Sequence, residues 1–316
     1  MHEDSEIGDE RSLWQRALPE SFDTLVRGAF DVHVHGQPDL SPDFLNRGGD
    51  VDVARLAHSY GISGWVLKSH LWQTTDRARL IQEQLDGLDF TVYGSITLNP
   101  VMGGLDATVV ELAAAHGARV IFLPTWGASA DVARGGYIAE KLRSIAPSFD
   151  AYSRRSAISL LDSNGRLTPA AVDVLDACHQ LGLSLATGHC ALAESRAVVE
   201  YCASRQPVLL THPIHYIEHA RELREFTELG AFIEFCNSPI VHPDAHVKVR
   251  DVHDAITEIG PDQVILSTDV FSRWAPPEPE CLRMFAEQLA YLGWQPDQLR
   301  TMLARNPRRF LGLATV

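Results

Sequence analysis

A pair of histidines separated by one residue lies near the start of the chain, in the stretch FDVHVHGQPD at residues 30–39. Side chains alternate between the two faces of an extended strand, so His33 and His35 should lie on the same face. Two neutral imidazoles on one face can bind a single divalent metal ion. Histidines at a strand end can also be satisfied by ordinary hydrogen bonds, so the pair predicts a metal site only if further ligands join it.

Potential ligands also stand at the ends of four other apolar runs. They are Lys68 and His70 in GWVLKSH, His189 in LSLATGHC, His212 in PVLLTHP and Asp269 in QVILSTDV. Each alone is explained most simply as a hydrogen-bonded residue at a strand end. Five apolar runs that all end in a potential ligand indicate a metal centre built from distant parts of the chain.

The apolar runs and the periodic stretches between them predict eight strands, each followed by a helix. The expected strands are 29–35, 64–70, 90–99, 118–126, 183–190, 207–213, 231–238 and 263–270. The runs are continuously apolar rather than alternating, as in a parallel sheet that is buried on both faces. The simplest architecture is an α/β fold, a single (β/α)8 TIM-type barrel, whose functional residues lie at the carboxyl ends of the strands. An open doubly wound sheet is the alternative, but no glycine-rich fingerprint follows the first strand.

The domain organisation expected from this pattern is an N-terminal arm at residues 1–28 and one barrel at residues 29–316. No change in composition marks a second domain. A long insertion follows the fourth strand at roughly residues 127–167, and a loop of that length is usually functional or disordered. It is long enough to act as a lid over the mouth of the barrel.

The composition narrows the classes of partner. The 316 residues are 45% hydrophobic and 22% charged, an ordinary globular balance, and 27 basic against 41 acidic residues give a net charge of −14. A surface this acidic disfavours nucleic acids and anionic membranes as partners. The start of the chain has no basic region followed by an apolar stretch, and five unpatterned cysteines suit a reducing compartment, so we expect a cytoplasmic protein.

The joint pattern of ligands resembles the amidohydrolase superfamily of metal-dependent hydrolases, from HVH at the first strand to TD at the eighth and the closing NPRRFLGL. Within it, the chain looks most like a branch with a VLKSH-type second strand. The resemblance implies that His33 and His35 are the HxH pair of the family, that His189 and His212 are its two later histidines, and that Asp269 is its eighth-strand aspartate. It also implies one or two divalent metal ions, with Zn expected and Mn or Fe as alternatives.

The chain departs from the family pattern at the fourth strand. Binuclear members usually supply a bridging carboxylated lysine there, but this strand reads IFLPTW. Lys68 is the only lysine at a strand end, and as a carbamate it would bridge two metals. Otherwise it would orient substrate or pair with Asp269, and burial beside a metal then requires a lowered pKa. His70 shares the strand face of Lys68, where it would contact substrate or support the ligands.

The activity implied by the resemblance is hydrolysis of an amide, cyclic amide, lactone or ester bond of a small molecule by a metal-activated water. Asp269 would accept the proton of the water and return it to the leaving group, with Lys68 and His70 as further catalytic candidates. Candidates for substrate binding are Trp72, Trp126, Trp274 and Arg134 in the loops that follow the strands. The same tryptophans could instead pack the loops, and the arginine could be solvated.

Three other functions stay open. One is a mononuclear metal-dependent decarboxylase of the same superfamily that acts on a small carboxylic acid and leaves Lys68 unmodified. Another is a zinc peptidase, because residues 215–219 read HYIEH and match the H-x-x-E-H pattern of one peptidase class. The last is a barrel that binds a ligand without catalysis. A homo-oligomer is expected only by analogy with other barrels.

Overall fold

Eight parallel strands form the centre of the protein in the computed structural model, which describes residues 24–41, 48–217, 219–270 and 275–314. The strands pair in sequence order and are β1 (Phe30–His35), β2 (Gly64–Lys68), β3 (Thr91–Thr97), β4 (Ala118–Phe122), β5 (Ser184–Ala186), β6 (Val208–Leu210), β7 (Phe232–Cys236) and β8 (Val264–Ser267). The two edges of the sheet meet where the backbone N–H of Asp269 donates to the carbonyl of His33 at 2.9 Å. The predicted (β/α)8 barrel is confirmed, and the open doubly wound sheet is excluded.

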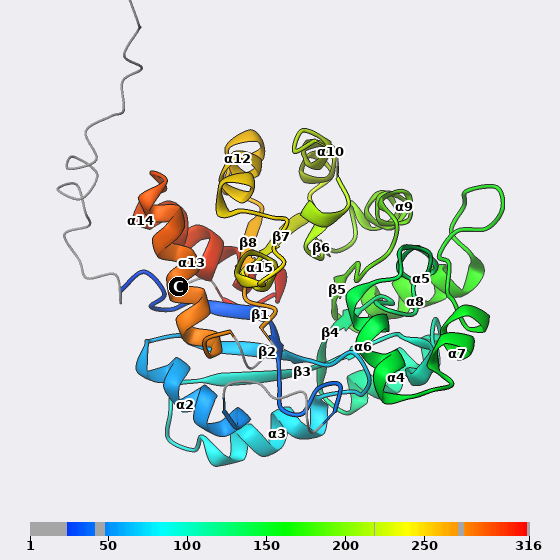
Figure 1. The fold of residues 1–316 in the computed structure, drawn as a ribbon, viewed down its shortest axis with the longest axis horizontal. Helices are drawn as coiled ribbons and strands as arrows, with labels where there is room; N and C mark the ends of the chain where they lie inside the picture. The colour runs from blue at the N-terminus through cyan, green and yellow to red at the C-terminus, as the bar shows by residue number, and fades with distance from the viewer. Residues whose placement is uncertain (1–23, 42–47, 218, 271–274, 315–316) are drawn as a thin grey trace, which may run out of the picture.

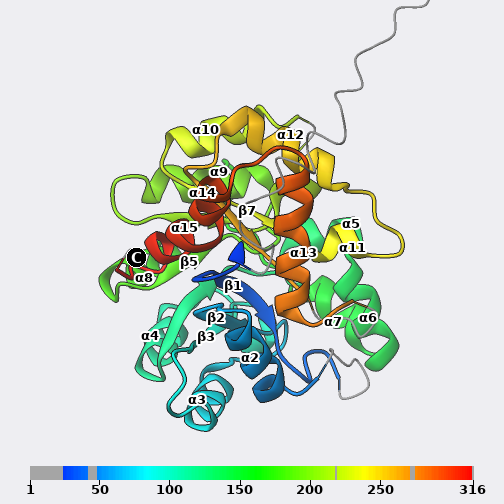
Figure 2. The ribbon, with the colours of Figure 1, turned by 90° about the vertical axis from the view of Figure 1, so that its left-hand side faces the viewer.

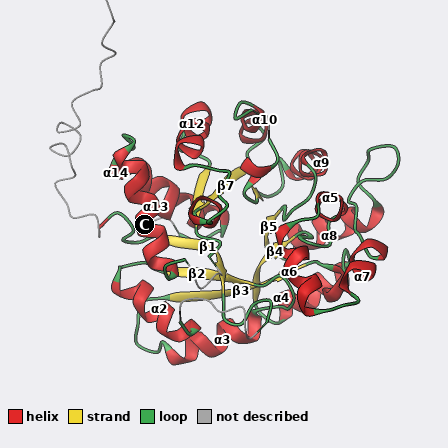
Figure 3. Ribbon diagram, viewed as in Figure 1, coloured by secondary structure: helices red, strands yellow, loops and turns green. Residues whose placement is uncertain are grey.

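Helices surround the strands on the outside of the barrel (Figures 1 and 3). The helices that follow β1 to β4 are α2 (Asp50–Ser59), α3 (Thr75–Gln84), α4 (Ala107–Ala115), α5 (Ser129–Arg134), α6 (Tyr137–Ile145), α7 (Phe149–Arg155) and α8 (Pro169–Gln180). Those that follow β5 to β8 are α9 (Leu192–Cys202), α10 (Glu222–Glu228), α11 (Ser238–Val241), α12 (Val249–Ile259), α13 (Glu278–Tyr291), α14 (Pro296–Arg300) and α15 (Asn306–Phe310). No helix in the described part of the chain has the length and apolar character needed to cross a membrane.

An apolar cluster fills the barrel on the side toward the amino ends of the strands. Its side chains come from alternate positions of the strands and include Val66, Phe122 and Phe232, and the end of α15 adds Phe310. Figure 2 shows α15 beside β1 and β5. Because side chains alternate along each strand, the next inward position after Val66 is Lys68, and the next after Phe232 is Glu234. A buried polar layer therefore lies next to the apolar one, on the side toward the carboxyl ends of the strands.

A β-bulge in β1 helps to form that polar layer. Between Asp31 and Val34 the strand advances three residues while β2 advances two, from Trp65 to Leu67. One extra residue reverses the alternation of side chains. Val32 therefore packs in the apolar interior, and the next residue, His33, also faces inward against Glu234.

The insertion after β4 is built of helices rather than an irregular loop. Three short helices, α5, α6 and α7, gather on one side of the barrel near α4 and α8 (Figure 1). The buried residues Trp126, Ile138, Leu142 and Phe149 hold them on the barrel. This cluster makes the insertion a packed subdomain at the rim, and α5 brings two side chains to the site described below.

The hydroxyl of Thr74 joins the start of α3 to the neighbouring strand. Thr74 does precede α3, but its side chain makes no capping hydrogen bond. Instead its hydroxyl donates to the carbonyl of Leu67 at 2.5 Å and ties the start of α3 to β2, one residue before Lys68. Thr168, in contrast, caps α8, because its side chain accepts a hydrogen bond from the backbone N–H of Ala171.

Candidate metal centre

Five histidines from the ends of four strands form a closed ring at the carboxyl end of the barrel. Centroid distances between neighbouring imidazoles are 5.4 Å from His33 to His35, 4.7 Å from His35 to His70 and 6.0 Å from His70 to His189. The ring continues with 5.1 Å from His189 to His212 and closes with 5.9 Å from His212 to His33. Residues far apart in the sequence thus converge at the rim where barrel chemistry is expected.

Asp269 joins the HVH pair in one cluster of potential ligand atoms. Its Oδ1 lies 3.0 Å from Nε2 of His33 and 3.0 Å from Nε2 of His35. Metal–ligand bonds of about 2.0–2.2 Å place the ligands of one ion about 3 Å or slightly more apart, so these three atoms fit a common ion. Asp269 and His212 also have left-handed backbones, with φ of 51° and 30°, and such strain concentrates at functional sites.

Three carboxylates set the orientation of three of these histidines. Nδ1 of His33 lies 3.2 Å from both oxygens of Glu234, and Nδ1 of His35 lies 2.9 Å from Asp39. Nδ1 of His189 lies 3.2 Å from Asp131 of α5. A carboxylate accepts the Nδ1 proton and leaves the Nε2 lone pair for a metal, which is the usual arrangement around metal-binding histidines.

None of these three carboxylates was predicted from the sequence. Glu234 carried a usable signal, because an acidic residue in the middle of the apolar run AFIEFC must be buried and therefore paired. Asp39 stands four residues after His35 in an irregular stretch, and Asp131 stands 58 residues before its partner. For these two, only the folded arrangement reveals the pairing.

His212 supplies an orphaned polar atom. Its Nδ1 is buried and has no hydrogen-bond partner among the described residues. Buried polar atoms of native proteins are nearly always satisfied, so an unpaired imidazole nitrogen inside a ring of histidines fits a metal ion. Burial, together with the neighbouring His189, holds the pKa of His212 well below its ordinary value, so its ring is neutral and able to coordinate.

Lys68 is fully buried beneath this ring. Its Nζ lies 2.8 Å from Nε2 of His33 and 5.0 Å from the centroid of the Phe122 ring. Burial lowers the pKa of Lys68, although the charges of Asp269 and Glu234 act in the opposite direction. The amine therefore lies next to a nitrogen of one predicted metal ligand, His33.

The charges around His33 favour a cation at this position. Burial and the charge of Lys68 act against protonation of His33, but Asp269 and Glu234 outweigh them and raise its pKa to about 9 in the metal-free protein. The pKa of Asp269 lies well below its usual range, because its histidine partners outweigh the effect of burial. The donor set of imidazoles and carboxylates is one that Zn and similar divalent ions prefer, so the residues fit the metal implied by the sequence.

The predicted substrate-binding residues have different surroundings. Trp72 is 58% exposed just after β2, whereas Trp126 is buried and its indole N–H donates to the carbonyl of His70 at 2.8 Å. Trp126 therefore has the packing role, and Trp274 lies outside the described residues. Arg134 donates to the carbonyl of His189 at 3.0 Å, and its guanidinium lies 4.2 Å from the centroid of the Tyr216 ring.

The H-x-x-E-H stretch does not form the helix that its peptidase chemistry requires. His215 is the last residue of the 3-10 turn η3 (Pro213–His215), and α10 begins at Glu222, after His219. Residue 218 of this stretch lies outside the described part of the chain. His215 instead lies beside the histidine ring, with its centroid 5.5 Å from that of His212.

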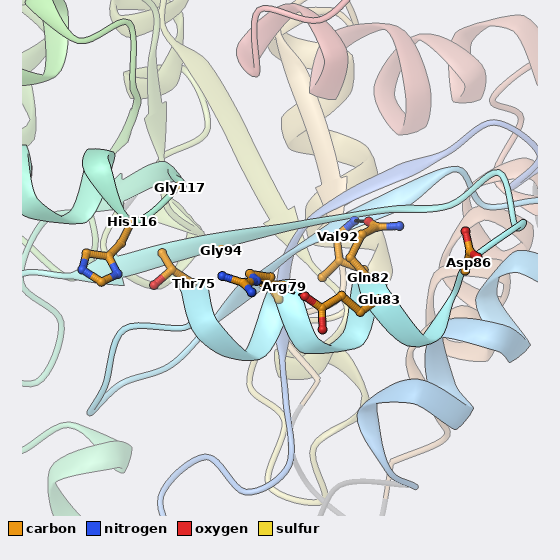
Figure 4. Close-up of a pocket in the computed structure, with 10 residues that line it drawn as sticks. Thr75, Arg79, Gln82, Glu83, Asp86, Val92, Gly94, His116 and Gly117 are labelled. Carbon is orange, nitrogen blue, oxygen red and sulfur yellow. Dashed lines mark hydrogen bonds and ion pairs between the residues drawn. The ribbon is translucent and has the colours of Figure 1, made fainter.

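A groove of about 550 Å³ on the outside of the barrel is separate from this centre (Figure 4). It lies along α3 and β3 and is lined by residues such as Thr75, Arg79, Gln82 and His116. None of its lining residues belongs to the histidine ring.

Comparisons with known proteins agree with the architecture. A family model described as "Family of unknown function (DUF6282)" matches residues 28–234, more than half of the chain, and the chain therefore belongs to this family. No curated protein sequence matches it.

Among solved structures, the chain is similar to an amidohydrolase from Pseudomonas aeruginosa, at 11% identity and a TM-score of 0.59, covering 92% of this chain and 98% of that one. It is also similar to the probable dipeptidase PvdM from the same organism, at 13% identity and a TM-score of 0.59, covering 96% and 98%. A probable 2-pyrone-4,6-dicarboxylic acid hydrolase from Acinetobacter baumannii matches at 14% identity and a TM-score of 0.55, covering 90% and 100%. The resemblance to the amidohydrolase superfamily is thus confirmed at the level of the fold.

Proposed function

We propose that the chain is a metal-dependent hydrolase that cleaves an amide, cyclic amide, lactone or ester bond of a small molecule. The observation that carries this proposal is the position of Asp269 Oδ1, 3.0 Å from Nε2 of both His33 and His35. The carboxylates on the Nδ1 side of these two rings support it, because they leave both Nε2 atoms for a metal. Zn is the ion proposed, with Mn or Fe as alternatives.

A bound divalent ion would supply an acidified water and Lewis acidity toward the substrate oxygen. His33, His35 and Asp269 would hold one ion, and His189 and His212 would hold a second. Asp269 also has the position of a general base, since its carboxylate can accept a proton from the attacking water and return it to the leaving group. The low pKa of Asp269 keeps it ionised at neutral pH, which is the form that can accept a proton.

Lys68 is proposed to carry a carbamate that bridges the two ions. The neutral amine adds to carbon dioxide, a new N–C bond forms, and one proton is released to solvent. Burial lowers the pKa of Lys68 and so favours the neutral amine that this reaction needs. The carbamate would bring negative charge to a site where an ammonium group would repel the metal.

The rim offers one residue suited to an acidic substrate. The guanidinium of Arg134 is held at the site by Asp131 and by the carbonyl of His189, and its side chain is 38% exposed. Arginine binds carboxylates through a planar fork of donors. A small substrate with a carboxylate next to the scissile carbonyl is therefore the class proposed. Two of the similar structures, the probable dipeptidase and the probable 2-pyrone-4,6-dicarboxylic acid hydrolase, are named for substrates that carry carboxylates.

The test is the metal content of the purified protein, measured by mass spectrometry of the elements, together with turnover of a panel of amides, lactones and esters. We expect metal in the wild type and its loss in His33→Ala and His35→Ala. The matched control is His116→Ala, because His116 is exposed and lies in the outer groove. Retention of metal by both HVH variants would contradict the proposal.

Measurements on the same purified protein also give the number of ions per chain and show whether Lys68 is modified. Two ions per chain and incorporation of labelled carbon dioxide at Lys68 support the hydrolase. One ion, an unmodified Lys68 and release of carbon dioxide from a small carboxylic acid would instead identify the mononuclear decarboxylase. Turnover of no compound in either class, with metal bound, would favour a ligand-binding barrel.

A further inference from the structure

The side chain of Asn99 has a fixed orientation behind the histidine ring. Its Oδ1 accepts hydrogen bonds from the backbone N–H groups of Thr125 at 2.9 Å and Gly127 at 3.0 Å. Because these two donors require an acceptor, the other end of the amide must be the NH2 group. That group donates to the carbonyl of His70 at 2.9 Å and to Oγ1 of Thr125 at 2.8 Å.

This orientation determines where the hydroxyl proton of Thr125 points. Thr125 and Asn99 are fully buried, and the Thr125 oxygen already accepts from Asn99. Among the described residues, its hydroxyl has one acceptor within reach, Nδ1 of His70 at 3.2 Å. A buried hydroxyl without an acceptor costs about 1–3 kcal/mol, so Thr125 donates and His70 Nδ1 accepts.

The tautomer of His70 is therefore opposite to that of the neighbouring histidines. In His33, His35 and His189, Nδ1 faces a carboxylate, which can only accept, and so Nδ1 carries the proton. In His70, Nδ1 faces a hydroxyl that donates, and so Nε2 carries the proton. A nitrogen that carries a proton has no lone pair for a metal.

We propose that His70 is a neutral hydrogen-bond donor in the reaction and not a metal ligand. Its ring lies between those of His35 and His189, beside the proposed ligands. When water adds to the substrate carbonyl, negative charge develops on the carbonyl oxygen, and the Nε2–H of His70 stabilises it without transferring its proton. Asn99 and Thr125 are positioning residues that keep this proton on Nε2. The inference rests on the proposed hydrolysis and gives His70 its role in it.

The direct test is the protonation state of the imidazoles in zinc-loaded protein labelled with ¹⁵N-histidine. Two-bond ¹H–¹⁵N spectra distinguish the two neutral tautomers, and the signals of His70 are those that disappear in His70→Gln. We expect the Nε2–H form for His70 and the Nδ1–H form for His33, His35 and His189. An Nδ1–H form for His70 would overturn the proposal.

Two variants of Thr125 separate its hydroxyl from its volume. Thr125→Val is nearly isosteric and removes the donor, so we expect the Nδ1–H form of His70 to appear. Thr125→Ser keeps the hydroxyl and should keep the Nε2–H form. The same tautomer in Thr125→Val as in the wild type would show that the hydroxyl does not determine it.

Metal content and kinetics complete the test. His70→Gln should retain as much zinc per chain as the wild type, whereas His33→Ala should lose it. With a substrate from the panel, His70→Ala should lower kcat by about 10²–10³ with little change in KM, as when one oxyanion donor is removed. Zinc loss in His70→Gln as large as in His33→Ala would make His70 a ligand. Absence of zinc from the wild type would refute the proposed function, whereas the tautomer of His70 would still be decided by the spectra.

Discussion

The exchange of Glu234 for glutamine tests how the protein prepares His33 for a metal. Asp269 and Glu234 raise the pKa of His33 to about 9 in the metal-free protein, against its ordinary value of 6.5. A metal ion must displace that proton before it can bind Nε2 or its neighbours. At pH 7 the competing proton therefore lowers the apparent affinity about 100-fold, which is about 2.7 kcal/mol at about 1.36 kcal/mol for each unit.

The sign of the pH dependence follows from this competition. The folded pKa of His33 is raised, so the proton is bound below about pH 9 and lost above it. The logarithm of the apparent zinc affinity should rise by at least one for each pH unit from about pH 7 to about pH 9 and then level off. In Glu234→Gln one of the two carboxylates that raise this pKa is gone, so the affinity should level off at a lower pH. The intrinsic affinity should also fall about 10–100-fold, because the amide makes the imidazole a weaker ligand.

The assay is competition for zinc with a chelator of known pH dependence, measured on metal-free wild type and variant. Glu83→Gln is the matched control, since Glu83 is exposed on α3 and pairs with Arg79 on the surface. Its profile should coincide with that of the wild type. An affinity of the wild type that does not change between about pH 7 and about pH 9, or a Glu234→Gln profile with an unchanged midpoint, would refute the reasoning.

Three other substitutions test separate parts of the structure. Asp131→Asn should lower zinc affinity about 10–100-fold in the same competition assay, because the carboxylate that accepts the Nδ1 proton of His189 is lost; an unchanged affinity would remove Asp131 from the site. Gly188→Ala should lower the free energy of unfolding, measured with urea, by about 3 kcal/mol or more, because Gly188 has a φ of +59° and a Cβ there would lie 2.3 Å from the carbonyl oxygen of Leu123. A stability near that of the wild type would refute this. Burial and the nearby charge of Asp31 raise the pKa of Glu278 well above its ordinary value, so the stabilising effect of its protonated form is lost as the pH rises. The stability of Glu278→Gln relative to the wild type should therefore grow from about pH 5 to about pH 8. A constant difference in stability over this range would contradict this.

Much of the barrel was predictable because its signals are local. Each strand is a short continuous apolar run, and Thr168-Pro169 marks the start of α8 through a cap that the structure retains. The potential ligands follow from the same reasoning, since the carboxyl ends of parallel strands must meet at one rim. The helical character of the insertion was missed because its three helices are short and are held by Trp126 and its neighbours rather than by their own periodicity.

The partners of the histidines could not be predicted, because they depend on the register between strands. His33 faces Glu234 only because a bulge in β1 lets it follow Val32 into the interior. His189 meets Asp131 only because the insertion places α5 over the end of β5. Neither contact leaves a trace in the sequence around the histidine concerned. The sequence therefore predicts which histidines meet at the rim but not which side chains orient them.

That difference matters for mechanism, because the partner on Nδ1 decides what an imidazole can do. His35 and His70 are adjacent in the ring, with a centroid distance of 4.7 Å, and in the sequence both are histidines at a strand end. On the proposals above, Asp39 would leave the first ring as a ligand by accepting its proton, and Thr125 would make the second a donor by supplying one. The chemistry of this rim is therefore encoded as much in residues 39, 99 and 125 as in the histidines themselves.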